Sequence, residues 1–359
     1  MANRLKVTAN GRSFGVRCGA VLLDSALIQG VELPHDCRAG RCGSCLTRVR
    51  RGVTVGGESP QPGMVYACQA RVLSDLDIEV ESLPDPVRIG AWIGSLTELC
   101  SDVVQLEIQT ETPPGMLPGQ YCRFAFKGFP ARSYSPTAAL LGPSRPGTFF
   151  LHIQRVRDGR VSSQLGHTIQ AGHPLTIEGP FGTAFHRPGR SERLVLAASG
   201  TGFAPIYAVA EAALREDFNR HIVMVAGARR LQSLYMPAAL GWMSTAPNVT
   251  VIATADEAQS LSRVVRTGTP ADHLPPLSAH DVVYAAGGPR IVKAVSKVAV
   301  EAGAQVHFDV FQPAGPEETG GGLGGLVSKM SAWAKKPAMA RSEAVPMHRR
   351  RMEIWARGA

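Results

Sequence analysis

The chain carries, at residues 36–45, the stretch Asp36-Cys37-Arg38-Ala39-Gly40-Arg41-Cys42-Gly43-Ser44-Cys45, and a further cysteine follows at Cys68. The spacing C-x4-C-x2-C with a fourth, distant cysteine is the plant-type spacing of 2Fe–2S ligands. Three thiolates must converge from one loop, and Gly40 and Gly43 permit the backbone dihedrals that this convergence needs. The stretch therefore predicts a 2Fe–2S cluster whose ligands are Cys37, Cys42, Cys45 and Cys68.

A zinc site is the alternative for these cysteines. Zinc sites usually combine two C-x2-C pairs, and Cys68 has no such partner, so the spacing favours iron and sulfide. The other three cysteines, at positions 18, 100 and 122, are expected to be small buried hydrophobic residues. An odd total of seven, without an apolar signal segment at the start, argues against a disulfide framework and favours the cytoplasm.

Composition and charge exclude other classes of protein. Hydrophobic residues make up 44 % and charged residues 19 % of the 359 residues, which is typical of a globular protein of two or three domains. The formal net charge is +9, but the segment from Leu326 onward carries eight basic and two acidic residues and so holds six of these charges. We therefore expect no nucleic-acid partner, and no membrane partner, because no apolar run approaches the roughly 18 residues of a membrane span.

The pattern of apolar residues divides the chain into four parts. Residues 1–84 mix short strands with one helix, and the prolines of Leu83-Pro84-Asp85-Pro86 mark a linker. Residues 87–189 show short strands between Pro/Gly turns, which is typical of a small antiparallel barrel. Strands alternate with helices over residues 190–312, which predicts a doubly wound parallel sheet. Residues 313–359 are glycine-rich and basic and are expected to form a flexible extension.

Within the expected barrel lies Arg132-Ser133-Tyr134-Ser135. This motif resembles the R-x-Y-S flavin motif of the ferredoxin–NADP⁺ reductase superfamily, and the resemblance implies that Arg132, Ser133, Tyr134 and Ser135 all bind the flavin cofactor. The resemblance implies that Arg132 pairs with the FAD pyrophosphate, as a planar guanidinium suits phosphate, and that Tyr134 lies against the isoalloxazine. It also implies that Ser135 acts catalytically, by a hydrogen bond near flavin N5, where hydride arrives.

Three further motifs extend the resemblance to the same superfamily. Gly159-Arg160-Val161-Ser162 is similar to its second flavin motif, which implies that Gly159 and Ser162 open a helix that holds the pyrophosphate. The turn Ser199-Gly200-Thr201-Gly202-Phe203-Ala204-Pro205 is similar to its G-G-T-G-x-A-P nucleotide motif. Ala286-Gly287-Gly288-Pro289 is similar to its C-G-x-P motif, with alanine in place of the cysteine. The implied nucleotide-binding residues are Gly200, Thr201, Gly202, Gly287 and Pro289.

Two points near the expected nucleotide site remain open in the sequence. Phe311 lies where the family often covers the flavin with an aromatic ring, which would make it a second catalytic residue, but an ordinary core aromatic at a strand end is equally consistent. Arg229 and Arg230 follow the expected second strand of the sheet. They could accept the 2′-phosphate of NADPH or could be solvated, so NADH and NADPH both remain possible.

The order of the motifs is more specific than any one of them. A plant-type ferredoxin domain of β-grasp fold, an FAD-binding barrel and an NAD(P)-binding domain, over about residues 1–312, resemble the reductase components of aromatic-ring-hydroxylating dioxygenase systems. Gly179-Pro180-Phe181-Gly182 and Phe308-Asp309-Val310-Phe311 look particularly like the terephthalate and naphthalene dioxygenase reductases. This resemblance implies a multidomain oxidoreductase that passes electrons from NAD(P)H through FAD and the cluster to a Rieske oxygenase.

Other functions are weighed beside this one. A reductase of a diiron monooxygenase, of the methane or phenol hydroxylase type, would have the same three parts in the same order. A metal-binding module with degenerate nucleotide domains is the non-catalytic alternative. For the C-terminal extension, the basic residues Lys335, Lys336 and 349–351 suggest either docking to an acidic oxygenase surface or a solvated segment.

Overall fold

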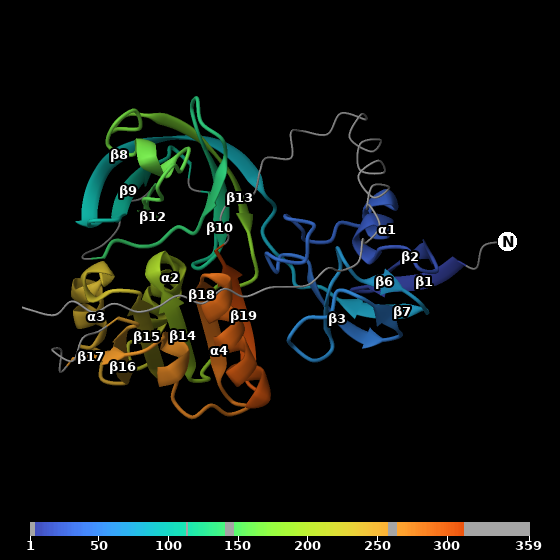
Figure 1. The fold of residues 1–359 in the computed structure, drawn as a ribbon. Coiled ribbons are helices and arrows are strands. Elements are labelled where there is room, and N and C mark those ends of the chain that lie inside the picture. The colour runs from blue at the N-terminus through green and yellow to red at the C-terminus, as the bar shows by residue number, and fades with distance from the viewer. Residues whose placement is uncertain (1–3, 113, 141–146, 258–263, 312–359) are drawn as a thin grey trace, which may run out of the picture. The chain divides into compact units, whose positions relative to one another are not determined.

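The structure is a computed structural model that describes residues 4–112, 114–140, 147–257 and 264–311 (Figure 1). The described residues belong to the compact unit Met1–Pro313. The expectations for the extension 313–359, including its flexibility and its docking role, lie outside the described residues.

The N-terminal part folds around a five-stranded mixed sheet in the order β2-β1-β7-β3-β5, with β1 and β7 parallel. Apolar residues of α1 (Leu22–Ile28) are buried in the same core as alternate residues of the strands. The expected cluster loop connects α1 to β3, and Cys68 lies between β5 and β6. The strands are β1 (Arg4–Ala9), β2 (Arg12–Arg17), β3 (Leu46–Arg51), β4 (Thr54–Val55), β5 (Met64–Tyr66), β6 (Arg71–Val72) and β7 (Leu76–Glu79).

The second part is a six-stranded antiparallel sheet in the order β11-β10-β13-β8-β9-β12. The segment after β11 closes this sheet into a barrel, because Thr137 exchanges two backbone hydrogen bonds, of 2.8 and 3.0 Å, with Phe150 of β12. Alternate residues such as Leu106 and Phe124 fill the interior. The strands are β8 (Val87–Cys100), β9 (Val103–Gln109), β10 (Tyr121–Phe126), β11 (Arg132–Tyr134), β12 (Thr148–Gln154) and β13 (Pro174–Phe181).

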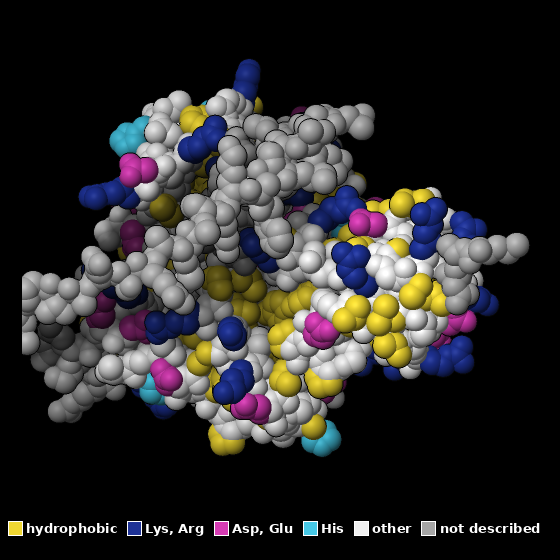
Figure 2. Space-filling model, turned by 45° about the vertical axis from the view of Figure 1, so that its right-hand side comes forward, with side chains coloured by type: hydrophobic (Ala, Val, Ile, Leu, Met, Phe, Trp, Pro, Cys, Tyr) yellow, Lys and Arg dark blue, Asp and Glu magenta, His cyan; other side chains and the backbone are white. Residues whose placement is uncertain are grey.

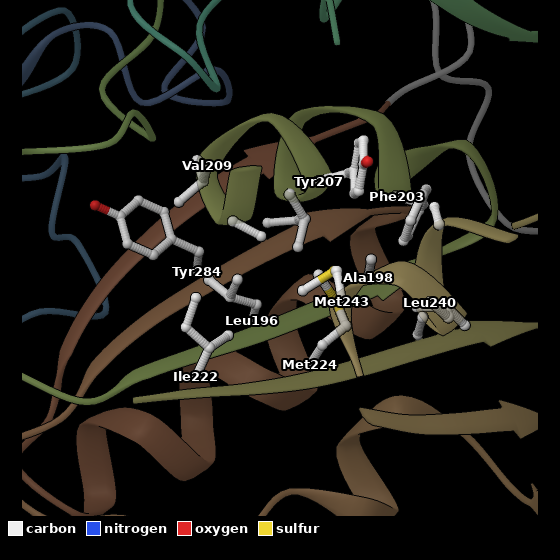
Figure 3. Close-up of a cluster of buried hydrophobic side chains, with 14 of the residues drawn as sticks. Leu196, Ala198, Phe203, Tyr207, Val209, Ile222, Met224, Leu240, Met243 and Tyr284 are labelled. Carbon is white, nitrogen blue, oxygen red and sulfur yellow. The ribbon is translucent and has the colours of Figure 1, made fainter. Parts of the chain in front are cut away.

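The third part is a parallel sheet in the order β17-β16-β15-β14-β18-β19. One face packs against α2 and α3 and the other against α4, so successive residues of β14 serve two cores. Figure 3 shows Leu196 and Ala198 of β14 below Phe203 and Tyr207 of α2. The elements are β14 (Leu194–Ser199), α2 (Phe203–Glu216), β15 (Ile222–Ala228), α3 (Pro237–Met243), β16 (Val249–Ala255), β17 (Val265–Thr267), β18 (Val282–Gly287), α4 (Pro289–Glu301) and β19 (Gln305–Val310).

The expected fold class is confirmed in all three parts, with two differences. The sequence pattern did not indicate the 14-residue strand β8, whose small and polar residues do not alternate cleanly, because it pairs with both β13 and β9 and bends at bulges. Cys18 is exposed and Cys100 half-buried, whereas Cys122 is buried as expected. Cys18 differs because it follows β2, an edge strand of its sheet.

Candidate functional site

The cysteine loop wraps its backbone around two pairs of sulfurs. The Cys45 and Cys68 Sγ atoms are 3.3 Å apart, and the amide of Gly40 donates to Cys68 Sγ at 3.2 Å. The amides of Ala39 and Cys42 both donate to Cys37 Sγ at 3.4 Å. Gly40 and Gly43 have φ values of +67° and +76°, which confirms that the loop uses their conformational freedom.

These donors and the burial of the sulfurs set the ionisation of the thiols. The hydrogen bond from Cys42 and the backbone amides lower the pKa of Cys37 to about 5. The pKa of Cys42 is raised by the same hydrogen bond, and burial raises the pKa of Cys45 to about 12. Cys37 therefore ionises readily by itself, whereas the buried sulfurs need the positive charge of a metal to become thiolates.

The four predicted ligands form two pairs, Cys37 with Cys42 and Cys45 with Cys68. A two-iron cluster needs this arrangement, because each iron takes two protein thiolates and shares the sulfides. In the part of the chain that the structure describes, no three His, Cys, Asp or Glu side chains are grouped as ligands of one metal ion would be. The donor set and the surrounding N–H groups thus fit a 2Fe–2S cluster.

The expected flavin strand is β11, at the edge of the barrel sheet. Arg132 and Tyr134 lie on the side of the barrel interior, where the Tyr134 ring packs 5.9 Å from that of Phe124. Ser133 points to the opposite face and is exposed, so the structure does not bring it together with its neighbours. Ser135 is buried, and its hydroxyl donates to Asp309 Oδ2 at 2.6 Å.

The second flavin motif leads into a 3₁₀ helix of three residues, Ser162–Gln164. The Ser162 hydroxyl accepts the amide of Val156 at 3.1 Å, and the amide of Ser163 donates to the Gly159 carbonyl at 3.1 Å. A Cβ on Gly159 would meet Ser162 Oγ at 2.4 Å, so this glycine is required by the loop itself. The role of Gly159 and Ser162 toward the pyrophosphate stays a prediction.

The nucleotide turn lies where the parallel sheet changes direction. From β14 the chain proceeds to β15 on one side, and later to β18 on the other side. Ligands of such sheets bind outside the carboxyl ends of the strands at this switch point. A Cβ on Gly202 would lie 2.3 Å from the Ala286 carbonyl oxygen, and one on Gly287 would lie 2.9 Å from that of Ser199. The two predicted glycine motifs therefore pack directly against each other, ahead of the N-termini of α2 and α4.

The strand β19 links the nucleotide turn to the flavin strand. The amide of Phe311 donates to the Gly287 carbonyl at 2.8 Å, and Asp309 accepts the Ser135 hydroxyl. Burial raises the pKa of Asp309 to about 6. Phe311 itself is half-buried just beyond the strand end. Sequence reasoning missed Asp309, although an acid inside the apolar stretch 306–311 was a usable signal.

A second link, also missed in the sequence, joins the barrel to the cluster loop. The Tyr121 hydroxyl donates to Asp36 Oδ2 at 2.6 Å and lies 3.2 Å from Ser44 Oγ. Arg123 forms an ion pair with the same Asp36 carboxylate. Ser44 Oγ in turn is 3.4 Å from the Sγ of Cys42. The sequence indicates Tyr121 and Arg123 only as members of a strand, because nothing local marks their partners.

The expected coenzyme arginines are exposed at the end of β15. Arg229 and Arg230 pair with the same carboxylate, that of Glu257, at 3.0 and 3.2 Å. These ion pairs hold the pKa of Glu257 below its usual range. Both guanidinium groups are thus engaged by one carboxylate, and the choice between NADH and NADPH stays open.

Basic and acidic side chains are interspersed over the face drawn in Figure 2. Within the described ranges, the structure contains no helix that combines the length and apolar character required of a membrane span.

Comparison with known proteins adds independent findings. Residues 6–73 match the 2Fe-2S iron-sulfur cluster binding domain, residues 92–186 the oxidoreductase FAD-binding domain, and residues 196–297 the oxidoreductase NAD-binding domain. Together these three models account for most of the chain, in the order that the sequence motifs predict.

Individual relatives cover the same parts. The chain is 29 % identical over 333 residues to reductase component 1 of terephthalate 1,2-dioxygenase from Comamonas sp, covering 87 % of this chain and 98 % of that protein. It is 30 % identical over 245 residues to the xylene/toluene monooxygenase electron transfer component of Pseudomonas putida, covering 64 % and 69 %. The solved ferredoxin reductase of carbazole 1,9a-dioxygenase superimposes with a TM-score of 0.60 at 26 % identity, covering 86 % and 99 %.

Proposed function

Since the chain belongs to the family of 2Fe–2S and FAD-containing, NAD(P)H-dependent reductase components that deliver electrons to oxygenases, we propose that its partner is the Rieske oxygenase of an aromatic-ring dioxygenase system. A terephthalate-type dioxygenase is favoured, since the reductase of such a system aligns over 98 % of its own length. The observation that carries the proposal is the joining of three sites: Ser135 bonds Asp309 beside the nucleotide turn, and Tyr121 bonds the cluster loop.

When bound, FAD accepts hydride as an electron pair and the 2Fe–2S cluster passes single electrons onward, downhill by roughly 250 mV to a Rieske centre. The residues of the chain would hold these groups in place. Gly202 and Gly287 let the two nucleotide turns pack against each other, a Cβ on Gly200 would meet nothing within 4 Å, and the N-terminus of the 14-residue helix α2 would favour the phosphates of a dinucleotide. Arg132 would supply a guanidinium for the FAD pyrophosphate. Asp309 orients the Ser135 hydroxyl in a buried position.

The electron exit is proposed on the exposed side of the cluster loop. Cys37 is exposed, whereas Cys45 and Cys68 are buried, so an acceptor reaches the cluster from the side of Cys37. Arg38 and Arg41 are exposed on the same loop, where Arg38 forms an ion pair with Asp24. An acceptor with an acidic docking surface would present further carboxylates to these guanidinium groups.

We also place the protein in the cytoplasm. None of the seven cysteines forms a disulfide, and cysteine ligands persist in a reducing compartment. A reductase of a diiron monooxygenase remains the second candidate, because the xylene/toluene monooxygenase component aligns with the same domains.

The test pairs the purified reductase with a Rieske dioxygenase and, separately, with a diiron hydroxylase. The measured quantity is aromatic product formed per NADH or NADPH consumed. We expect tight coupling with the Rieske enzyme, and coupling with the diiron enzyme alone would overturn that choice of partner. A visible spectrum without flavin and iron–sulfur absorption would contradict the proposed function as a whole.

A further inference from the structure

Tyr121 reaches from strand β10 of the barrel to the cluster loop. It is the first residue of β10, and the next residue, Cys122, pairs with Tyr134 of the flavin strand β11. The Tyr121 hydroxyl donates to Asp36 Oδ2 at 2.6 Å and is 3.2 Å from Ser44 Oγ. The side chain of Tyr121 thus contacts the cysteine loop, and its backbone belongs to the strand that pairs with the flavin strand.

The ring of Tyr121 is held on several sides. Its centroid lies 5.7 Å from that of Phe181, and a Cβ on Gly182 would approach Tyr121 Cδ1 to 3.0 Å. The Arg123 guanidinium lies 5.0 Å above the Phe181 ring. It also pairs with Asp36, the carboxylate that accepts the Tyr121 hydroxyl. Tyr121 is only 6 % exposed, so neither its ring nor its hydroxyl has freedom to choose other partners.

The hydrogen-bond directions follow from the donors available. The Asp36 carboxylate is paired with Arg123 and accepts the Tyr121 proton. Because the Tyr121 proton is used in this bond, the Tyr121 oxygen can only accept a second hydrogen bond. The Ser44 hydroxyl, which has one proton, donates it to that oxygen. Ser44 Oγ lies 3.4 Å from Cys42 Sγ, and a Cys42 thiolate that binds iron has no proton of its own, so it would be a second acceptor for the serine proton. Tyr121 and the Cys42 sulfur therefore compete for one hydroxyl.

We propose that Tyr121 is a positioning residue that couples the flavin strand to the cluster, by holding the cysteine loop on the barrel and by drawing the Ser44 proton away from the Cys42 sulfur. The inference rests on the proposed function, because it concerns the step in which one electron leaves the reduced flavin and converts one ferric iron of the cluster to ferrous. No proton has to accompany this electron. Hydrogen bonds to ligand sulfurs stabilise the more negative, reduced cluster.

The test is a double-mutant cycle on the holoprotein, with the cluster midpoint potential measured by EPR-monitored redox titration. Tyr121→Phe keeps the ring and removes the acceptor, so Ser44 turns to Cys42. We expect the equilibrium for cluster reduction to shift about threefold to tenfold toward the reduced state, up to ~59 mV for one electron. In a Ser44→Ala background the same change should leave the potential unmoved. Tyr207→Phe, which removes a buried hydroxyl 3.5 Å from the Leu140 carbonyl, is the matched control without an effect.

An unchanged potential in Tyr121→Phe, or the same shift with and without Ser44, would overturn the proposal. If Tyr121→Phe assembles no cluster, the single variant Ser44→Ala tests the proposal instead. Its potential should stay within about threefold of the wild type, since the serine proton is directed to Tyr121, and a clearly lower potential contradicts the coupling. A protein that contains flavin and iron but shows these contrary potentials refutes only the role of Tyr121. A protein without flavin or iron refutes the proposed function.

Discussion

The close approach of the two glycine motifs makes Gly202→Ala a sharp perturbation. The new Cβ would lie 2.3 Å from the Ala286 carbonyl oxygen and 2.6 Å from the amide nitrogen of Gly287, and both of these atoms are backbone. Ordinary contacts begin near 3.4 Å, so the turns after β14 and β18 must separate by ~1 Å. Overpacking of this kind costs about 1–3 kcal/mol of the free energy of unfolding.

The same displacement reaches the coenzyme. A shift of ~1 Å in a positioned reactant can reduce the rate by up to about a hundredfold. We expect kcat/KM for NADH, measured as flavin-dependent ferricyanide reduction, to fall by about tenfold to a hundredfold, which corresponds to roughly 1.4–2.7 kcal/mol. Ferricyanide is chosen because it accepts electrons from flavin directly and leaves the cluster out of the measurement.

Gly241→Ala is the matched control. Gly241 lies in α3, and its added Cβ would meet nothing within 4 Å. Alanine is the better helix former by about 1 kcal/mol, so this variant should be equally stable or more stable, with unchanged kcat/KM. Unfolding by urea and steady-state kinetics on both variants check the argument. If Gly202→Ala matches the wild type in both measurements, the contact between the two turns does not matter and the reasoning is refuted.

Three further predictions concern the cluster, the barrel and the flavin strand. Cys42→Ser should lose the iron–sulfur absorption and the reduction of cytochrome c but keep the reduction of ferricyanide. Cys18→Ser, the control, should keep all three properties. An intact iron–sulfur spectrum in Cys42→Ser would contradict the assignment of Cys42 as a ligand. Burial lowers the pKa of His152 to about 3, below its unfolded value of ~6.5, so stability is complete above pH 6.5 and is lost as pH falls toward 3. Between pH 8 and 6 the free energy of unfolding should fall by about 0.8 kcal/mol because of His152. In His152→Phe, urea unfolding should show no such fall. An equal pH dependence in both proteins argues against a neutral buried histidine. Asp309 has a raised pKa of about 6, so Asp309→Asn should lower kcat for ferricyanide reduction about tenfold and abolish an inflection near pH 6; a surviving inflection assigns it to another group.

Much of this molecule is determined by local sequence. The spacing of the cysteines from 37 to 45, with Gly40 and Gly43 between them, selects a loop that gathers thiolates, and the structure forms it with both glycines at positive φ. The glycine turn Gly200–Gly202 lies between the buried strand β14 and the helix α2, where the chain has to turn sharply. The periods of apolar residues were sufficient to separate a barrel from a doubly wound sheet. These features depend on neighbours within a few residues, so a single sequence reveals them.

Other assignments depend on how the local backbone folds. The motif of Gly159 and Ser162 leads into a single 3₁₀ turn, in which the Ser162 hydroxyl accepts the amide of Val156. Ser133 lies on the face opposite to Arg132 and Tyr134, since successive residues of a strand alternate. A motif names the residue types that are present, but the pleat and the loop decide where each side chain points.

Only the tertiary structure decided which side chains connect the three sites. Ser135 and Asp309 are 174 positions apart, and Tyr121 is 85 positions from Asp36 and 77 from Ser44. Hydrogen bonds at such separations leave no periodicity or spacing in the sequence, because they arise only when separately folded sheets pack together. The sequence by itself determined which cofactors this protein can hold, and the packing of its domains decided which side chains join the cluster loop, the flavin strand and the nucleotide turn.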